Sequence, residues 1–340
     1  MRVATPLAAR AAGPRRAHSF SPVMAIGILS VAAGLERRDL LSGALLAAAV
    51  LTFAAVVVAN LIAAGWSSDA VDGRRGDPHS ALVLFTWVAA CGVLGESVAG
   101  RLPPAEVTFG VLAATGWGVG VWVMVSALRG HTGGWRSWEV SGSWLLAVVA
   151  PQSLSILASS LAARTGYEVI LGAGVAFWIV GIAVYCALIG LIIRRLARSE
   201  LGIDQLTPDY WITMGALAIS TVAALDLSAQ AGAWSPPLVA IAGVTLIYSA
   251  LWIPLMLVAE VMQMRHRRLT FGHDILRWST VFPLGMFSVA SYGLARMAAF
   301  PDLALVAQGF LWAGLALALL NAGSAVPAAT TTLRRIVWCE

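Results

Sequence analysis

Long apolar stretches alternate with short polar breaks along almost the whole chain. Ten of these stretches approach or exceed the ~20 apolar residues that an α-helix needs to cross a bilayer. They are Phe20–Leu35, Leu40–Trp66, Ser80–Ala99, Val107–Leu128, Gly142–Ala163, Val169–Ile193, Pro208–Leu227, Pro237–Met262, Ile275–Ala299 and Leu303–Val326. The pattern predicts an all-α integral membrane protein with ten transmembrane helices over residues 20–327, a basic cytoplasmic tail at 1–19 and a second cytoplasmic tail at 328–340.

The arginines support this count independently, because loops on the cytoplasmic side of a membrane carry an excess of positive residues. With the N-terminus in the cytoplasm, 17 of the 22 arginines fall on the cytoplasmic face. The other five, Arg37, Arg38, Arg101, Arg164 and Arg296, fall on the opposite face. One span more or fewer would destroy this bias. We therefore expect a multi-pass protein of the plasma (inner) membrane with both termini in the cytoplasm.

The first stretch needs a separate check, because a basic pair such as Arg15 and Arg16 also precedes the apolar part of a signal peptide. The stretch contains Ser21, Pro22 and Ser30, and no convincing small-residue cleavage site follows it before Glu36. We therefore interpret it as the first transmembrane helix, with a cleaved signal peptide as the alternative.

The composition excludes several classes of protein. Hydrophobic residues make up 59% of the chain and charged residues 11%, whereas soluble domains are about 25% charged. The absence of lysine excludes P-loop nucleotide hydrolysis and Schiff-base chemistry with pyridoxal phosphate or retinal. The three cysteines lie far apart and the five histidines form no HExxH pair, so neither residue type predicts a metal site. We expect no cofactor.

Prolines recur near the start or in the middle of alternate stretches, at Pro22, Pro78, Pro151, Pro208 and Pro283. This spacing is typical of five repeated helical hairpins. A proline inside a helix bends it and frees a carbonyl, which in a membrane must face protein or water. We therefore expect bent odd-numbered helices around a central lumen, with kinks at Pro22, Pro151 and Pro283. The alternative, that the kinks only help packing, stays open and is preferred for Pro254.

Five segments carry a resemblance to a known family. They are HSFSPVMAIGILSVA, DPHSALVLFTW, WLLAVVAPQSLSILA, PDYWITMGALAIST and RWSTVFPLGMFSVASYGLA. On these segments the chain resembles the tellurite-resistance/dicarboxylate transporter family, which includes the bacterial tellurite-resistance membrane protein and the plant slow anion channel. The resemblance spans all ten stretches. It implies five hairpins in a quasi-fivefold arrangement, an inner ring of odd-numbered helices around a pore, and a homotrimer with one pore per subunit.

The resemblance also implies that a phenylalanine of the ninth helix plugs the pore, and the pattern places this role on Phe282, directly before Pro283. An apolar ring dewets a constriction, which a dehydrated anion crosses only at a high energetic cost. Phe287 is the competing aromatic, but it lies about 140° away around the helix. Both rings cannot face one lumen, so we assign the gate to Phe282. Without the resemblance, Phe282 would be interpreted as an ordinary core aromatic.

Small and hydroxyl-bearing residues of the odd-numbered helices are candidates for the pore wall, because they tolerate a hydrated anion without trapping it. The candidates are Ser155, Ser159, Gly215, Ser220 and Gly285. Such residues are equally common where membrane helices touch, so helix packing stays open for each. In the fourth helix, Gly116 and Gly120 are interpreted as a packing face.

Ionisable residues near membrane depth are few: Glu96, Asp226, Glu260 and Arg296. They lie close to helix ends, where the insertion penalty falls, and Arg296 is a candidate partner for Asp226 or Glu96. No chain of carboxylates crosses the membrane, which disfavours a dedicated proton relay but leaves coupling through a single group open. Arginines at the mouths are expected to attract anions.

The predicted function is transmembrane transport of small anions through a pore gated by Phe282. The resemblance implies tellurite, C4-dicarboxylates such as malate, sulfite, nitrate or chloride as candidate substrates. The alternative is a proton-coupled exporter of dicarboxylate or sulfite. A lipid-modifying enzyme is less favoured, because it would need intramembrane histidines or paired carboxylates. The basic run Met264–Arg268 is interpreted as a loop edge near anionic lipid rather than a nucleic-acid site.

Overall fold

The structure is a computed structural model of the chain. It describes residues 20–65, 78–99, 102–130, 140–198, 200–201, 207–267, 277–297 and 300–337, and the regular structure within these ranges is entirely helical. The predicted basic tail at 1–19 lies outside the described residues.

The α-helices of the described residues follow the ten predicted stretches closely. They are α2 (Ser21–Leu35), α3 (Asp39–Gly65), α4 (Pro78–Val98), α5 (Pro103–Gly130), α6 (Leu146–Thr165), α7 (Glu168–Ala197), α8 (Ile212–Ser228), α9 (Ser235–Arg267), α10 (Trp278–Met297) and α11 (Asp302–Val337). Short 3₁₀ turns precede three of them: η3 (Gly142–Leu145), η5 (Pro208–Trp211) and η6 (Gly232–Trp234). The main difference lies in α11, which continues to Val337 and so includes most of the segment predicted as a tail.

Most of these helices are able to cross a membrane. Eight helical segments of the described chain are long and apolar enough to do so, and α2 is a shorter apolar helix of 15 residues. The eight do not include α10, which has 20 residues. Most residues of both α2 and α10 are buried inside the protein. A helix surrounded by protein does not need the uniformly apolar surface of one that faces lipid, so the fold remains that of an all-α membrane protein.

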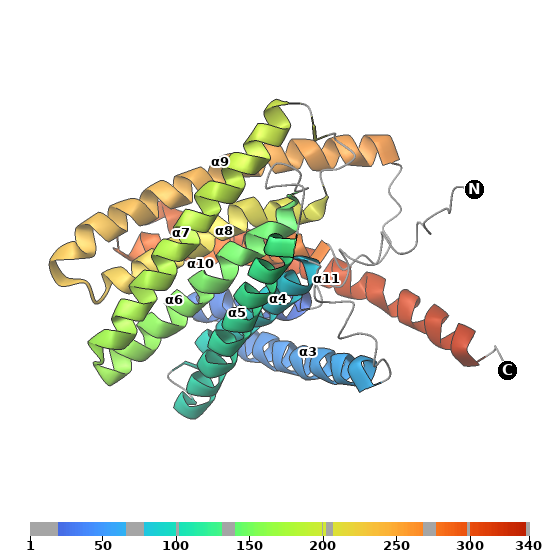
Figure 1. Cartoon of the computed structure of the whole chain (residues 1–340), viewed down its shortest axis with the longest axis horizontal. Coiled ribbons are helices and arrows are strands. Elements are labelled where there is room, and N and C mark those ends of the chain that lie inside the picture. The colour runs from blue at the N-terminus through green and yellow to red at the C-terminus, as the bar shows by residue number, and fades with distance from the viewer. Residues whose placement is uncertain are drawn as a thin grey trace.

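The helices form an inner and an outer layer. Each odd-numbered span of the prediction packs against the next helix in a hairpin: α2 with α3, α4 with α5, α6 with α7, α8 with α9, and α10 with α11. The first helices of the hairpins also contact one another in a closed cycle, α2–α4–α6–α8–α10–α2. In the most apolar part of the spans containing α4, α6 and α8, 72–89% of the residues are buried inside the protein. The corresponding share in α3, α5, α7, α9 and α11 is 6–28%. Figure 1 shows α8 and α10 at the centre of the molecule, with α3 and α9 along its edges. The quasi-fivefold symmetry of this ring stays a prediction.

A glycine lies at every interface of the inner ring. Its missing side chain leaves room for the neighbouring helix. The pairs are Gly27 with Val93 (α2–α4), Gly92 with Ser153 (α4–α6), Gly142 with the backbone of Asp209 and Tyr210 (η3–η5), Gly215 with Pro283 (α8–α10) and Gly285 with Ile28 (α10–α2). A Cβ atom on Gly92 would lie 2.5 Å from the Cβ of Ser153, and one on Gly285 would lie 2.5 Å from Cγ2 of Ile28. Small residues of this kind allow membrane helices to approach closely.

Two more glycines pack α5 against its hairpin partner α4. A Cβ atom on Gly116 would lie 2.8 Å from Cδ1 of Trp87, and one on Gly120 would lie 2.8 Å from Cε1 of Phe85. The two glycines are four residues apart, so they lie on the same face of the helix. The predicted packing face is confirmed.

A buried carboxylate joins the starts of α6 and α8. Asp209 Oδ2 accepts hydrogen bonds from the backbone N of Ser143 at 2.7 Å and from its Oγ at 2.6 Å, and Asp209 Oδ1 accepts one from Thr207. Asp209 is buried, and hydrogen bonds to a buried charge are among the stronger ones. This cluster fixes η3 against η5 at the point where Gly142 allows the backbones to meet.

The prolines take two different positions. Pro151 and Pro283 lie inside α6 and α10, as expected. Pro22, by contrast, lies in the first turn of α2, and Pro78 and Pro208 begin α4 and η5. The first turn of a helix has no internal partner for its N–H groups, so a proline there bends nothing. The prediction of a kink at Pro22, and of five bent helices, is wrong.

The contact at Gly142 yields a stability prediction. Gly142→Ala forces a methyl group against the backbone of Asp209 and Tyr210, which unlike a flexible side chain cannot move aside. We expect a loss of about 1–3 kcal/mol, the usual cost of overpacking, measured as a lower unfolding temperature in detergent. The matched control is Gly118→Ala in α5, where no atom lies within 4 Å and alanine is the better helix former. Equal behaviour of the two variants would contradict the close contact at Gly142.

Candidate functional site

The inner ring encloses a cavity of about 430 Å³ that all five inner helices line. The lining residues are Ile28, Val31 and Leu35 of α2; Gly92, Val93 and Glu96 of α4; Ser153 and Ile156 of α6; Ile219, Val222, Leu225 and Asp226 of α8; and Met286, Val289, Tyr292, Gly293, Arg296 and Met297 of α10. Nearly all of them lie in the C-terminal half of their helix. The five inner helices therefore run in the same direction, with the cavity toward their common C-terminal end.

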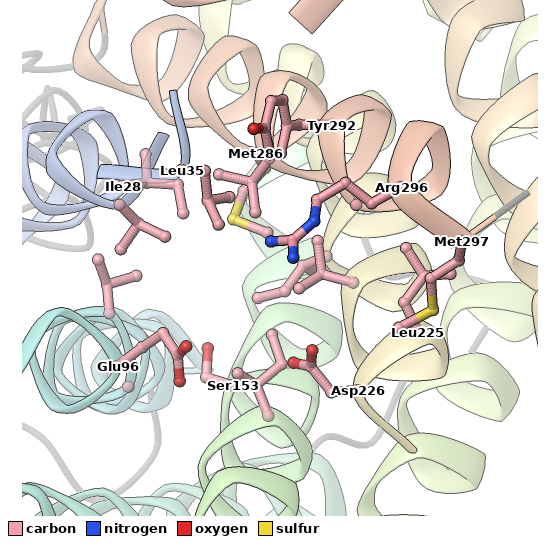
Figure 2. Close-up of a pocket in the computed structure, with 18 residues that line it drawn as sticks. Ile28, Leu35, Glu96, Ser153, Leu225, Asp226, Met286, Tyr292, Arg296 and Met297 are labelled. Carbon is pink, nitrogen blue, oxygen red and sulfur yellow. The ribbon is translucent and has the colours of Figure 1, made fainter. Parts of the chain in front are cut away.

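Few of the lining side chains are polar, and three of those are ionisable at ordinary pH. Glu96 comes from α4, Asp226 from α8 and Arg296 from α10, while Ser153 and Tyr292 add hydroxyl groups. In Figure 2 the guanidinium of Arg296 extends into the cavity toward the side on which the Glu96 and Asp226 carboxyl groups lie. The rest of the wall is mainly aliphatic or thioether side chains. Such a cavity is apolar with a few convergent charges, which is typical of a site for a small molecule or ion.

The charged groups of the cavity are not paired with one another. Within the described residues, the ion pairs are Arg38–Glu36, Arg164–Glu106 and Arg198–Glu200. The predicted pairing of Arg296 with Asp226 or Glu96 is therefore not formed. The buried acid of this end is instead Glu106, which Arg164 neutralises between α5 and α6.

The direction of the inner helices adds to the negative charge of the cavity. The C-terminal end of a helix carries a partial negative charge of roughly half a unit, felt within its last turn. Leu35, Asp226 and Arg296 all belong to the last turns of their helices. Arg296 is thus the one cation among the lining residues of a cavity that otherwise contains two carboxylates and the ends of helix dipoles.

Phe282 is buried in α10, with 2% of its surface exposed. At ~100° per residue, all six α10 residues that line the cavity lie within about 80° of Phe282 around the helix axis. Met286 is four residues, or about 6 Å, further along this face. Phe287 points elsewhere and packs on Phe310 of α11, with ring centroids 4.5 Å apart. The register thus puts Phe282, and not Phe287, on the side of α10 that lines the cavity, although Phe282 is not itself one of the lining residues.

The five small residues predicted to line a pore do not line this cavity. Gly215 packs on Pro283 and Gly285 on Ile28, while the hydroxyl of Ser159 would lie 3.4 Å from a Cβ atom on Gly174 of α7. Ser220 donates its hydroxyl hydrogen bond to the carbonyl of Ala216 in its own helix. Ser155 is fully buried, and its hydroxyl has no hydrogen-bond partner among the described residues. Their contacts favour the packing alternative, particularly for the two glycines.

Glu96, Asp226 and Arg296 are recognisable in the sequence as ionisable residues near membrane depth, but their position in one cavity is not. The sequence gives no sign that Ser153 and Tyr292 line the same cavity. A usable signal was present in α10, because Met286, Val289, Gly293 and Arg296 follow Phe282 at steps of three and four residues. That spacing marks one face of a helix. Extending the face from the predicted gate would have identified Arg296 as a lining residue.

Comparison with known proteins agrees with this architecture. A sequence model of the voltage-dependent anion channel family, SLAC1, matches residues 16–326, a range that begins before α2 and ends within α11. Two uncharacterized membrane proteins of Mycobacterium tuberculosis, from strains CDC 1551 / Oshkosh and ATCC 25618 / H37Rv, are each 31% identical to the chain over 137 residues. Those residues cover 39% of this chain and 70% of each relative. The resemblance found in the sequence is thereby confirmed: the chain belongs to the SLAC1 family of voltage-dependent anion channels, membrane proteins that transport anions.

Proposed function

We propose that this protein conducts small anions along the axis of its inner helix ring and that Phe282 closes the path. The observation that carries the proposal is the position of the cavity. All five inner helices line it, and a regular helical register from Met286 would put Phe282 about one turn further along the same side of α10. A path along the ring axis would therefore pass from an open cavity directly to a buried aromatic ring.

The size of the cavity suits a partly hydrated anion, and the apolar ring beyond it would oppose the passage of one. A volume of about 430 Å³ has room for a small anion with part of its hydration shell, since a water molecule occupies ~30 Å³ of liquid. The apolar ring of Phe282 offers no hydrogen bond to replace that shell. An anion would have to lose water there, which is how a hydrophobic constriction blocks conduction.

The contacts around Phe282 favour opening by a rotation of its side chain. The adjacent Pro283 is seated against Gly215 of α8, and Gly285 is seated against Ile28 of α2. These contacts hold the backbone of α10 between two neighbours, although a proline inside a helix removes one hydrogen bond. We infer that the aromatic ring moves between rotamers while α10 stays in place.

The cavity faces away from the cytoplasm in the orientation that the arginines favour. Placing both termini on the cytoplasmic side of a plasma (inner) membrane leaves 17 of 22 arginines on that side, as the positive-inside rule expects. The C-terminal ends of the inner helices, and the cavity with them, then lie toward the outside. The candidate anions remain tellurite, C4-dicarboxylates, sulfite, nitrate and chloride, supported by the family resemblance.

A test of the gate compares two phenylalanines of the same helix. We expect Phe282→Ala to raise anion flux into proteoliposomes at least severalfold, because it removes the apolar constriction. Flux would be measured for nitrate, chloride, malate, sulfite and tellurite, which also ranks the substrates. Phe287→Ala is the matched control: the ring is equally buried but packs on Phe310, so stability should fall without a rise in flux. Unchanged flux in Phe282→Ala would refute the gate and leave the fold intact.

The proposed homotrimer is tested separately. The resemblance implies one pore in each of three subunits, so we expect crosslinking in mild detergent to give a trimer band as its largest product. Because the chain has no lysine, the crosslinker must join carboxyl groups rather than lysine amines. A species that stays monomeric under these conditions would contradict the trimer.

A further inference from the structure

The charges that line the cavity conflict with a simple anion path. With both carboxylates ionised, the two negative charges of Glu96 and Asp226 exceed the one positive charge of Arg296. The last turns of the inner helices add partial negative charge. An anion entering this cavity would be repelled more than attracted. A path for anions with such a lining needs a compensating positive charge that comes and goes with the anion.

We propose that the cavity is an oxyanion-binding site in which Arg296 holds the anion while the Glu96–Asp226 pair takes up one proton. This inference rests on the proposed anion pathway. It adds to that pathway a binding residue, a class of anion and a dependence on protons.

Arg296 has the properties of the anion ligand. Its guanidinium forms no ion pair or hydrogen bond within the described residues, and it extends into the cavity (Figure 2). The planar fork of a guanidinium donates two parallel hydrogen bonds to two oxygens of one anion. A carboxylate or nitrate offers that geometry, whereas a spherical halide does not. The site should therefore prefer oxyanions to chloride.

The carboxylate pair has the properties of the proton site. Glu96 and Asp226 come from α4 and α8 and line the same cavity. Two carboxylates that share one site repel each other when both are ionised. Neither forms an ion pair or a hydrogen bond with a described residue, and Glu96 Oε2 is buried without a partner. A bound anion adds a third negative charge to the cavity. Taking up a proton relieves that repulsion, so anion and proton must strengthen each other's binding reciprocally.

The other groups that face this pair do not replace it. From α5 and α6 come Glu106 and Arg164, which form an ion pair with each other. From α10 come Arg296 itself and the phenol of Tyr292, while α2 contributes Ile28, Val31 and Leu35. No histidine is among the lining residues. The proton would come from water in the cavity, form an O–H bond at a carboxyl oxygen, and return to water when the anion leaves.

The test is nitrate binding to the purified full chain, measured by calorimetry at about pH 5.5 and about pH 7.5 in two buffers of different ionisation enthalpy. We expect at least tenfold tighter binding at the lower pH, because coupling to one proton gives up to tenfold per pH unit within its titration range and the two conditions lie about two units apart. The buffer dependence should reveal an uptake of up to one proton per nitrate. Chloride should bind more weakly than nitrate.

Variants assign these effects to residues. The double variant Glu96→Gln with Asp226→Asn should bind nitrate tightly at both pH values without taking up a proton. Arg296→Gln should bind nitrate at least tenfold more weakly, and Arg296→Lys should lose the preference for nitrate over chloride. The matched control is Glu168→Gln, which changes an exposed carboxylate at the start of α7 and should behave as the unaltered protein.

Two sets of results would overturn the proposal. One is nitrate affinity in the unaltered protein that does not change with pH, or binding without proton uptake; this result stands even if a variant fails to fold. The other is a double variant that keeps the pH dependence, or Arg296→Gln that binds as the unaltered protein does. Nitrate flux into proteoliposomes tests the transport function separately from the binding site. Proton-coupled nitrate binding without any flux would refute the transport function but not the oxyanion site.

Discussion

The inner ring depends on close backbone approach between neighbouring helices. Lipid is as apolar as the helices themselves, so membrane helices associate through packing rather than through the hydrophobic effect. At each of the five interfaces a glycine provides the close approach, from Gly27 against Val93 to Gly285 against Ile28. A larger side chain at these positions would hold the helices apart and open the ring. The closed cycle of contacts, and with it the cavity that the five inner helices line, depends on these five small residues.

The same packing sets the position of the proposed gate. Gly215 receives Pro283, so the proline that weakens the hydrogen bonding of α10 is also the residue that anchors it to α8. Gly285 anchors the next half-turn to α2. Phe282 lies directly before these two contacts. A ring on a fixed backbone can close a narrow path by adopting one rotamer and open it by adopting another, without a movement of helices that would break the interfaces.

Much of the fold was predictable from the sequence, because apolar length and arginine placement are strong signals in a membrane protein. Each predicted span coincides with a helix to within a few residues at most of its ends, apart from the extension of α11 to Val337. The site was less predictable. A proline signals a bend only inside a helix, and the sequence did not show that Pro22 stands in the first turn. Small residues such as Gly215 suit a lumen and a helix contact equally well, and only the neighbouring helix decides between them. The charges of Glu96, Asp226 and Arg296 were identified, but their common location depends on the order of helices in the ring.

The mixed charge of the cavity suits a site that an anion enters and leaves, rather than a site that holds the anion tightly. A permeant ion must be bound well enough to enter and weakly enough to leave. An arginine alone would attract an oxyanion, and because Arg296 is exposed, water and salt screen part of that attraction. Two carboxylates on the facing helices oppose that attraction whenever they are ionised. In the proposed site, Arg296 would supply selectivity for oxyanions and the carboxyl groups of Glu96 and Asp226 would limit how long an anion stays. The protons available to the cavity would set the balance between these two effects.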